Sequence, residues 1–597
     1  SLFRGELADA FAYSTSEELV DDLERLEGNR LAFLEPEIAE TTGDFVCLPE
    51  RLFVPLSVRV IETLDSELVR RLATITQLAL CYHVYPGASY TRKEHVLGAY
   101  YTTCRLLRQL ILDPANPLGA MILKAPQQRL AMVATLLHDM SHVPLMHEFE
   151  DSVPELSQRA FTAQLLAGAW GGRAFATVLQ RVLKSWDVKL EDLCLVLGAR
   201  DKAPSLFGGE PTQKEAKEHW ERQWDRADLQ LVRSIMDGSV DADKIDYLQR
   251  DALHVGVRFG HGVDAERIET QMTTVIETEG SGREALRVRC RMGAWRKGQA
   301  AAESLIGVRH SMYSQVYAHR TVRAARSMLN YITWKWRTSS RYTDFDGEEI
   351  ARDMFEFASY LKPTQSKRPL FDLAQGEVIH EITPKTTDNL PYNDSRVIRW
   401  MAFVSGDESA AGMAEALVSR DLYKNICSLE IGEAEDFMRT AFPKRKNVYL
   451  PTRLSARQWL SLIDHLSFHL EGFLSSGGSS SLRIREKLLP PLLLDVAIPK
   501  TMRTQSELSI VQEVLATSVT WSRVIRVESG KVGVVPGAVV GRSPVYEAYG
   551  GGPDDSLAPV VIRLFARGDL APDLRPRVDS RMVASWLGSF RPRDEDS

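Results

Sequence analysis

Apolar residues recur every three or four positions through most of residues 51–340, and strand-like alternation is rare there. This period matches the turn of an α-helix, so the pattern predicts a mainly α-helical structure. One such series consists of Val69, Leu72, Ile75, Leu78 and Ala79.

The pattern changes twice in the second half of the chain. Four prolines between residues 363 and 391 lie in a polar stretch that predicts surface connections, and helical spacing resumes near Val397. Residues 475–481 read SSGGSSS, the composition of a flexible linker. Beyond them, short apolar runs bounded by Pro and Gly predict the strands of a smaller α/β lobe: PLLLDVAIP, VIRVESGKVGVVPGAVV and APVVIRLFARG. The expected parts are therefore an N-terminal segment 1–50, a main helical domain 51–340, a helical extension 341–475 and a C-terminal α/β lobe 483–597.

Composition excludes several classes of protein. The 597 residues are 44% hydrophobic and 26% charged, as in ordinary globular proteins, which excludes a disordered or fibrous chain. No apolar run reaches the 18 or so residues of a membrane-spanning helix, and Glu6 and Asp9 lie where a secretory signal would be apolar. The six cysteines are at least 23 positions apart, which excludes a CxxC pair. We therefore expect a cytoplasmic protein with reduced cysteines and no membrane partner.

The charge balance bears on the partners. The formal net charge is −7, spread over a long chain, so no general attraction to nucleic acid is expected. Any phosphate group must be bound by a local set of cations.

Histidines are concentrated in one segment. Five of the 13 fall within the 65 residues from His83 to His147. Among them, His138 and Asp139 are adjacent at the end of the apolar run LAMVATLL. An imidazole and a carboxylate at the end of a buried helix can bind one metal ion, although an isolated pair of this kind more often has a core or capping role.

Two further blocks change the meaning of that pair. The blocks GASYTRKEHVLG, LLHDMSHVPLMH and DADKIDYLQRD follow one another in this order. Together they resemble the HD-domain deoxynucleoside triphosphate triphosphohydrolases, the family of the vertebrate SAM-and-HD-domain restriction enzyme and of bacterial dGTPases. The resemblance extends from about Pro55 to Met328, with weaker similarity at SRDLYK and LLLDVAIPK.

The resemblance implies a helical HD metal phosphohydrolase core at 51–340 that hydrolyses dNTPs to deoxynucleoside and inorganic triphosphate. Such an enzyme would control or deplete dNTP pools, and antiviral defence is one role for it in a microbe. The implied cofactor is a divalent ion, namely Mn, Fe, Zn, Ni or Mg. The implied metal ligands are His95, His138, Asp139 and Asp243.

Catalytic residues are implied by the same alignment. His142 would contact phosphate, His147 would protonate the leaving 5′ oxygen, and Glu150 would orient His147. One departure concerns a further histidine of the family, about 18 residues on, because no histidine occurs between His147 and His219.

Substrate-binding residues follow helical spacing. Two trios of residues are spaced four positions apart, so each is predicted to lie along one side of a helix: Asp243, Tyr247, Asp251 and Arg309, Tyr313, Tyr317. Without the resemblance, aromatic residues at this spacing are more often part of a core. With it, phosphate contacts are implied for Arg92, Lys244 and Arg309, and contacts to the deoxyribose side of the substrate for Gln77, Tyr247, Asp251 and Tyr317. The Tyr317 ring would leave no room for a ribose 2′ hydroxyl.

A regulatory nucleotide site is implied by the motif RDLYK, which resembles an RxLxK motif of the family. We expect Arg420 and Lys424 on one helical face, gripping the phosphates of a dNTP or GTP in a homo-oligomer, a dimer to a tetramer. Ala73 stands where the family has an arginine against the activating guanine. The other residues implied for this site are Asp65, Arg267 and Arg320.

Three alternatives stay open. The first is an HD phosphodiesterase or nucleotidase for another nucleotide, which the sets of phosphate and sugar residues disfavour. The second is a nucleotide-sensing protein with a vestigial HD site, disfavoured by four filled metal positions but left open by the missing histidine. The third, nucleic-acid binding or cleavage, conflicts with the net charge of −7 and the lack of a basic stripe.

Overall fold

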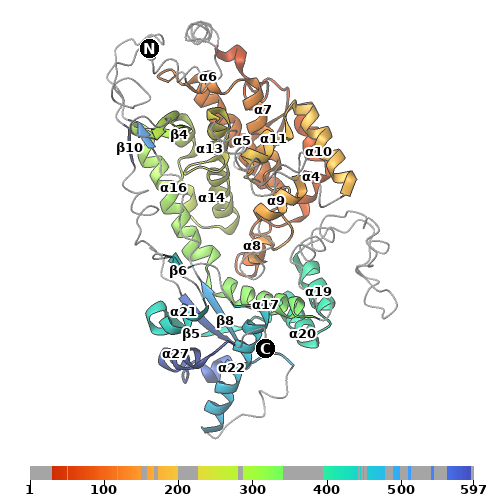
Figure 1. Cartoon of the computed structure of the whole chain (residues 1–597), viewed down its shortest axis with the longest axis vertical. Coiled ribbons are helices and arrows are strands. Elements are labelled where there is room, and N and C mark those ends of the chain that lie inside the picture. Colours follow the sequence, from red (N-terminus) through yellow and green to blue (C-terminus); the bar gives the residue numbers. More distant parts are fainter. Residues whose placement is uncertain are drawn as a thin grey trace.

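The structure of the chain is a computed structural model (Figure 1). It describes residues 30–49, 52–116, 118–149, 158–166, 172–198, 226–279, 287–339, 394–441, 444–445, 448–449, 454–476, 488–497, 509–511, 540–542 and 561–592. The prolines between 363 and 391 lie outside these residues. The expected linker at 475–481 begins inside a helix that ends at Ser476, and its remainder also lies outside the described residues.

Helices dominate the described residues between 30 and 339, so the expected mainly α-helical fold is confirmed. The α-helices here are α3 (Val58–Asp65), α4 (Glu67–Arg70), α5 (Arg92–Leu112), α6 (Leu118–Ile122), α7 (Ala125–Leu137), α8 (Met146–Phe149), α9 (Gln158–Leu166), α10 (Gly172–Trp186), α11 (Leu190–Val196), α13 (Ala227–Met236), α14 (Ala242–Val255), α15 (Ala265–Thr270), α16 (Gln299–Met312) and α17 (Arg320–Arg337). Shorter helical turns are η1 (Arg30–Phe33), η3 (Arg71–Thr74), η4 (Ala79–His83), η7 (Phe259–Gly262), η8 (Arg296–Gly298) and the π-helical turn η9 (Tyr313–Tyr317).

Two antiparallel hairpins accompany these helices. β1 (Asp44–Leu48) pairs with β2 (Leu52–Leu56), and β3 (Met272–Glu279) pairs with β4 (Arg287–Trp295). The second hairpin is extended by distant residues, because β9 (Ser509–Val511) runs parallel to β4 and β10 (Val540–Arg542) pairs with β9. The apolar spacing did not predict this hairpin.

The second part of the chain combines helices with a three-stranded antiparallel sheet. The sheet has the order β5 (Lys424–Glu430), β11 (Val561–Ala566), β8 (Leu492–Ala497), and the last two confirm strands expected in the C-terminal lobe. Because β5 precedes the SSGGSSS segment, one sheet joins the expected helical extension to that lobe. The helices are α19 (Asp394–Ser405), α20 (Glu408–Val418), α21 (Glu435–Ala441), α22 (Ala456–Ser476), α26 (Ala571–Leu574) and α27 (Ser580–Ser589), with η13 (Ile431–Ala434) and a small hairpin of β6 (Lys444–Arg445) and β7 (Val448–Tyr449).

Helix α17 connects the two parts. It packs against α19, α20, α22 and β8, and Figure 1 shows it between the helices of the first part and the sheet of the second. The Arg323 side chain of α17 forms a buried ion pair with Asp495 of β8, with Nε 2.8 Å from Oδ2. The two parts are therefore in direct contact through this helix.

The series from Val69 to Ala79 is not one helix, which corrects that expectation. Val69 lies in α4 and Leu72 lies in η3. Ile75, which follows η3, is extended with φ −103° and ψ 122°. The extended residues run beside 90–92, where Gln77 N–H donates to Tyr90 O at 3.0 Å and Arg92 N–H donates to Ile75 O at 2.9 Å. The spacing correctly predicted burial, since all five residues are buried, but short turns can bury the same positions as a helix.

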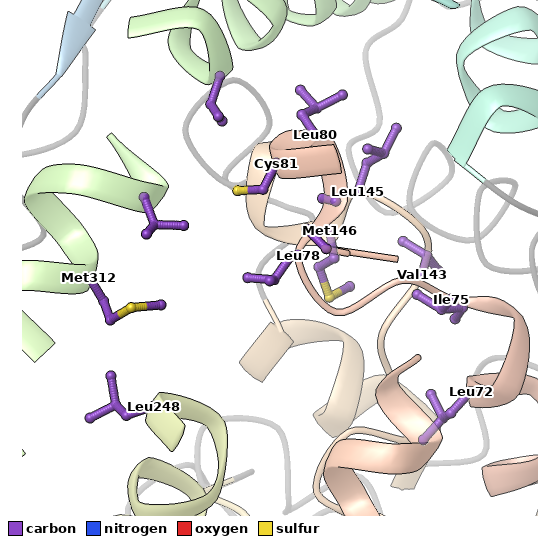
Figure 2. Packing of buried hydrophobic residues seen from close by; sticks show 14 of the residues in the cluster. Leu72, Ile75, Leu78, Leu80, Cys81, Val143, Leu145, Met146, Leu248 and Met312 are labelled. Atoms are coloured by element: carbon purple, nitrogen blue, oxygen red, sulfur yellow. The ribbon is translucent and has the colours of Figure 1, made fainter. Parts of the chain in front are cut away.

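A dense apolar cluster supports the segments that carry the predicted site. Figure 2 shows Leu78 and Met146 on the side toward Leu248 of α14 and Met312 of α16, with Leu145 in the same cluster. All five are at most 6% exposed, so the 78–83 segment, the 143–146 loop and both helices pack on one core.

Two expectations from composition can be compared with the structure. All six cysteines lie in the described residues, and none forms a disulfide. Among those residues, no helix combines the length and the apolar character that a membrane span requires.

Candidate metal centre and active site

Helix α7 places His138 at its carboxyl end. The helix has a proline in its first turn and is buried on all sides from Leu130 to Leu137, which explains its nearly continuous apolar sequence. His138 Nδ1 lies 2.7 Å from Thr135 O, so it must carry the proton and donate it to this carbonyl. Nε2 then has a free lone pair, and within the described residues this buried atom has no hydrogen-bond partner.

The other predicted ligands meet that nitrogen. His95 of α5 directs Nδ1 to Asp246 Oδ2 at 2.9 Å and Nε2 to Asp243 Oδ1 at 3.0 Å. The Asp243 oxygen is also 3.6 Å from His138 Nε2, which in turn is 3.3 Å from Asp139 Oδ1. Ligand atoms of His95, His138 and Asp139 all lie within 4.8 Å of one another. Two imidazole nitrogens and two carboxylates therefore converge, and this donor set fits a divalent transition metal.

Electrostatics at this cluster favour a cation. Burial would lower the pKa of His95, but hydrogen bonds to Asp243 and Asp246 raise it to about 10. Burial would raise the pKa of Asp139, but His142, His138 and Arg92 hold it far below its usual range. A site that attracts protons so strongly also attracts a metal ion, because both compete for the same lone pairs.

Two further histidines extend from the cluster. Buried His142 has Nδ1 3.1 Å from Asp139 Oδ1 and Nε2 3.2 Å from Nε2 of the exposed His147. Burial and the charge of Arg92 lower the pKa of His142 well below its ordinary value. Glu150, predicted to orient His147, lies outside the described residues.

The loop that carries these histidines is held by Arg71. This buried side chain donates to Met140 O at 2.9 Å and to His142 O at 2.5 Å. Its role was not predicted, because nothing in the sequence shows which backbone carbonyls an arginine will reach.

The three predicted phosphate-binding cations lie on the helices of the site. Arg92 of α5 donates Nη1 to Asp139 Oδ2 at 3.0 Å. Lys244 of α14 bonds to Asp241 and, at 3.0 Å, to Gly238 O. The Arg309 guanidinium of α16 lies 5.6 Å from the centre of the Tyr313 ring, and α16 packs against α14.

Asp251 is the centre of the predicted sugar site. It is buried, and the hydroxyl groups of Tyr90 and Tyr317 donate to its two carboxylate oxygens. Burial raises the pKa of Asp251 to about 6 although both hydrogen bonds lower it. Tyr247 lies one turn earlier on α14, and Gln77 Oε1 is buried without a hydrogen-bond partner among the described residues. The carboxylate, hydroxyl and amide groups of these residues can therefore accept a hydrogen bond from a bound hydroxyl group or donate one to it.

The expected helical trio on α16 needs a correction. Arg309 lies in α16, but this helix ends at Met312, and Tyr313 and Tyr317 belong to the π-helical turn η9. The Ala318 N–H donates to Tyr313 O at 2.9 Å, a bond over five residues instead of four. The two tyrosine rings still meet, with centroids 5.0 Å apart. The trio on α14, by contrast, lies in one regular helix.

The prediction that Arg420 and Lys424 lie on one helical face is wrong. Helix α20 ends at Val418, Arg420 follows in a left-handed turn with φ 66°, and Lys424 is the first residue of β5. The Arg420 guanidinium donates Nε and Nη2 to His83 O at 3.0 and 2.9 Å. The other residues implied for this site are exposed: Asp65 at the end of α3, Arg267 in α15 and Arg320 at the start of α17. Their grouping into a nucleotide site stays a prediction.

Comparisons with known proteins agree with the HD-type blocks. No family model matches the sequence. The chain is 30% identical over 274 residues to an uncharacterized protein of Methanocaldococcus jannaschii, covering 46% of each chain. It is 29% identical over 263 residues to the uncharacterized protein YwfO of Bacillus subtilis, covering 44% of this chain and 48% of that one.

Other relatives have a named activity. The chain is 27% identical over 213 residues to the deoxynucleoside triphosphate triphosphohydrolase SAMHD1 of Gallus gallus, covering 34% of this chain and 32% of that one. A solved phosphohydrolase of Bacteroides thetaiotaomicron is 17% identical, with a TM-score of 0.47 and coverage of 88% of this chain and 99% of that one. The sequence matches confirm the resemblance to HD-domain triphosphohydrolases. The matched segment spans about half the length of the first two relatives and about a third of the length of the third.

Removal of one ligand tests the metal centre. His138→Ala or Asp139→Ala should abolish binding of a divalent ion, because three remaining ligands leave an incomplete site. The measurement is metal content by elemental analysis after reconstitution and desalting, and His465→Ala, on α22, is the control that should keep the metal. One full metal equivalent in either site variant would contradict the assignment.

Proposed function

We propose that the protein is a metal-dependent hydrolase that converts dNTPs to deoxynucleoside and inorganic triphosphate. The observation that carries this proposal is the convergence of His95, His138 and Asp243 on one point, with Asp251 two turns further along the helix of Asp243. The similarity to SAMHD1 supports the choice of substrate.

The reaction places water oxygen on the α-phosphorus and breaks the bond to the 5′ oxygen. A divalent ion held by the four ligands would polarise a phosphoryl oxygen and acidify the attacking water. The departing 5′ oxygen needs a proton, which His147 would donate. This exposed imidazole contacts His142, and His142 contacts the metal ligand Asp139. His142 lies between Asp139 and His147, so it connects His147 to the cluster.

Charge neutralisation falls to three cations. A triphosphate carries about four negative charges, and these need paired groups when solvent is excluded. Asp139 holds the guanidinium group of Arg92, and Asp241 holds the ammonium group of Lys244. Both cations are therefore fixed before the substrate arrives. Such preorganisation lowers the cost of binding the phosphates.

The sugar would be recognised by hydrogen bonds and by shape. The Asp251 carboxylate has lone pairs left on both oxygens after accepting from Tyr90 and Tyr317, and Gln77 Oε1 is a second acceptor. Tyr317 would combine two tasks, holding Asp251 with its hydroxyl and closing the space beside C2′ with its ring.

Product analysis tests the function. Metal-loaded protein is incubated with each dNTP and NTP, and the products are separated by chromatography. Deoxynucleoside plus triphosphate is the expected result. Monophosphate or diphosphate products would favour an HD nucleotidase or phosphodiesterase instead, and no turnover with any metal or added nucleotide would favour a vestigial site.

The role of His147 has its own test. His147→Ala should retain metal and substrate binding but lower the turnover rate about 10²- to 10⁴-fold, the usual contribution of a general acid. Single-turnover rates at saturating metal measure this, and His469→Ala is a control on α22. An unchanged rate would remove His147 from the mechanism.

Two variants at Tyr317 separate its tasks. Tyr317→Ala should weaken dNTP binding and admit NTPs, because both the ring and the hydroxyl are lost. Tyr317→Phe should keep discrimination against NTPs but raise KM, because only the hydrogen bond to Asp251 is lost. Competition between dGTP and GTP in one reaction measures the discrimination, and exclusion of GTP by the Ala variant would place the sugar filter elsewhere.

Regulation by a second nucleotide is part of the proposal. A dNTP or GTP bound at Arg420 and Lys424 in a homo-oligomer would have to displace His83 O from the Arg420 guanidinium. Bound nucleotide can drive assembly only by preferring the assembled state. One dNTP should then raise both the oligomer mass and the hydrolysis of a second dNTP, and the double variant Arg420→Glu, Lys424→Glu should lose both responses while keeping its metal. A single mass and hyperbolic kinetics at all nucleotide concentrations would count against regulation.

A further inference from the structure

A chain of buried charges lies behind His95, on the side away from the metal ligands. Asp246 Oδ2 is 2.9 Å from His95 Nδ1. Arg250 donates Nε to the same oxygen at 3.0 Å and Nη2 to Oδ1 at 2.6 Å. Its third nitrogen, Nη1, donates to Glu94 Oε1 at 3.0 Å, and His254 Nε2 lies 2.9 Å from that oxygen. The chain thus runs from a metal ligand to the partly exposed Glu94.

Burial gives these contacts their weight. His95 is 1% exposed, and Asp246 and Arg250 are each 4% exposed. Such a charge is costly unless it is paired and fully hydrogen-bonded. Both Asp246 oxygens have a partner in Arg250, which leaves Asp246 an ionised acceptor for the Nδ1–H of His95.

A glycine makes room for this arrangement. Gly98 lies one turn after His95 on α5, and a Cβ atom there would overlap both Asp246 Oδ1 and Arg250 Nη2. Any other side chain would push the ion pair away from α5 and Asp246 away from His95. This steric observation is independent of the charges and points to the same group.

We propose that Asp246, held by Arg250 and Glu94 in the space left by Gly98, is the positioning residue of His95. It fixes the proton on Nδ1, turns Nε2 toward Asp243 and increases the electron density that Nε2 offers to a cation. Carboxylate partners of metal-binding histidines typically change metal affinity about 10- to 100-fold. The inference concerns the metal centre of the proposed function and does not depend on which nucleotide is hydrolysed.

A purely structural ion pair is the competing explanation. Such a pair would stabilise the packing of α5 against α14 without affecting metal affinity in the folded protein. Both explanations predict a loss of stability when the pair is broken, but only the positioning role predicts a loss of metal affinity. The affinity must therefore be measured on folded protein without nucleotide.

The test is the metal affinity of Asp246→Asn in the full chain. Metal-free protein is titrated with Mn²⁺ or Co²⁺ against a chromophoric chelator, and the Co²⁺ absorption spectrum reports ligand geometry. We expect about 10- to 100-fold weaker binding and an altered Co²⁺ spectrum, since an amide keeps the hydrogen bond but loses the charge. The matched control is Asp495→Asn, which removes the carboxylate charge from another buried pair, the one with Arg323 between α17 and β8, and should lose stability but keep wild-type affinity.

Two further variants approach the same group differently. Gly98→Ala adds one methyl group without changing any charge, and Arg250→Lys keeps the charge but loses the two-pronged grip on Asp246. Both should weaken metal binding, and either can replace Asp246→Asn if that variant does not fold. Wild-type affinity in the folded variants, or an equal loss in Asp495→Asn, would overturn the proposal. If the affinity falls as expected while the wild-type protein releases no triphosphate from dNTPs, the proposed substrate fails and the positioning role stands.

Discussion

The candidate site depends on one constraint: two histidines from different helices must both present an unprotonated Nε2 to the same point. Each does so because its Nδ1 proton has a fixed acceptor, Thr135 O for His138 and the Asp246 carboxylate for His95. A neutral imidazole carries one proton, so the acceptor at Nδ1 determines which nitrogen can bind a cation. Without these partners the four ligands could still be neighbours, but their lone pairs would not converge.

Helix α14 serves both the metal ligands and the predicted sugar site. Its first turn carries Asp243, its second carries Asp246 and Tyr247, and its third carries Arg250 and Asp251. Asp241 caps the helix by accepting from Lys244 N–H at 2.7 Å. Close packing holds it against the segments before α5, since a Cβ on Gly87 would overlap His254 O, and the rings of Tyr90 and His254 stack with centroids 4.3 Å apart. A shift of α14 would therefore disturb both halves of the site together.

Residues from the second part of the chain reach the segment that carries Gln77. Thr76 donates to the buried Asp394 at the start of α19 at 2.5 Å, and Arg420 binds the carbonyl of His83. Both contacts join residues more than 300 positions apart. They place the second part of the chain in direct contact with the segment that carries Gln77.

The sequence by itself determined the helical class of the first part, the order of the three HD-type blocks and the residues of the predicted metal centre. The helical class is readable because apolar spacing within a helix is a local pattern, whereas the metal ligands were implied by the resemblance of the three short blocks to a known family. Tertiary structure alone decided the partners of those residues, including Asp246 for His95, Tyr90 for Asp251 and His83 for Arg420. It also decided that Tyr317 lies in a π-helical turn and that Arg420 follows the end of a helix, since a period of four residues is compatible with several backbone paths. Hydrogen-bond partners depend on which segments pack together, and that packing is set by burial over the whole chain, which no local pattern contains.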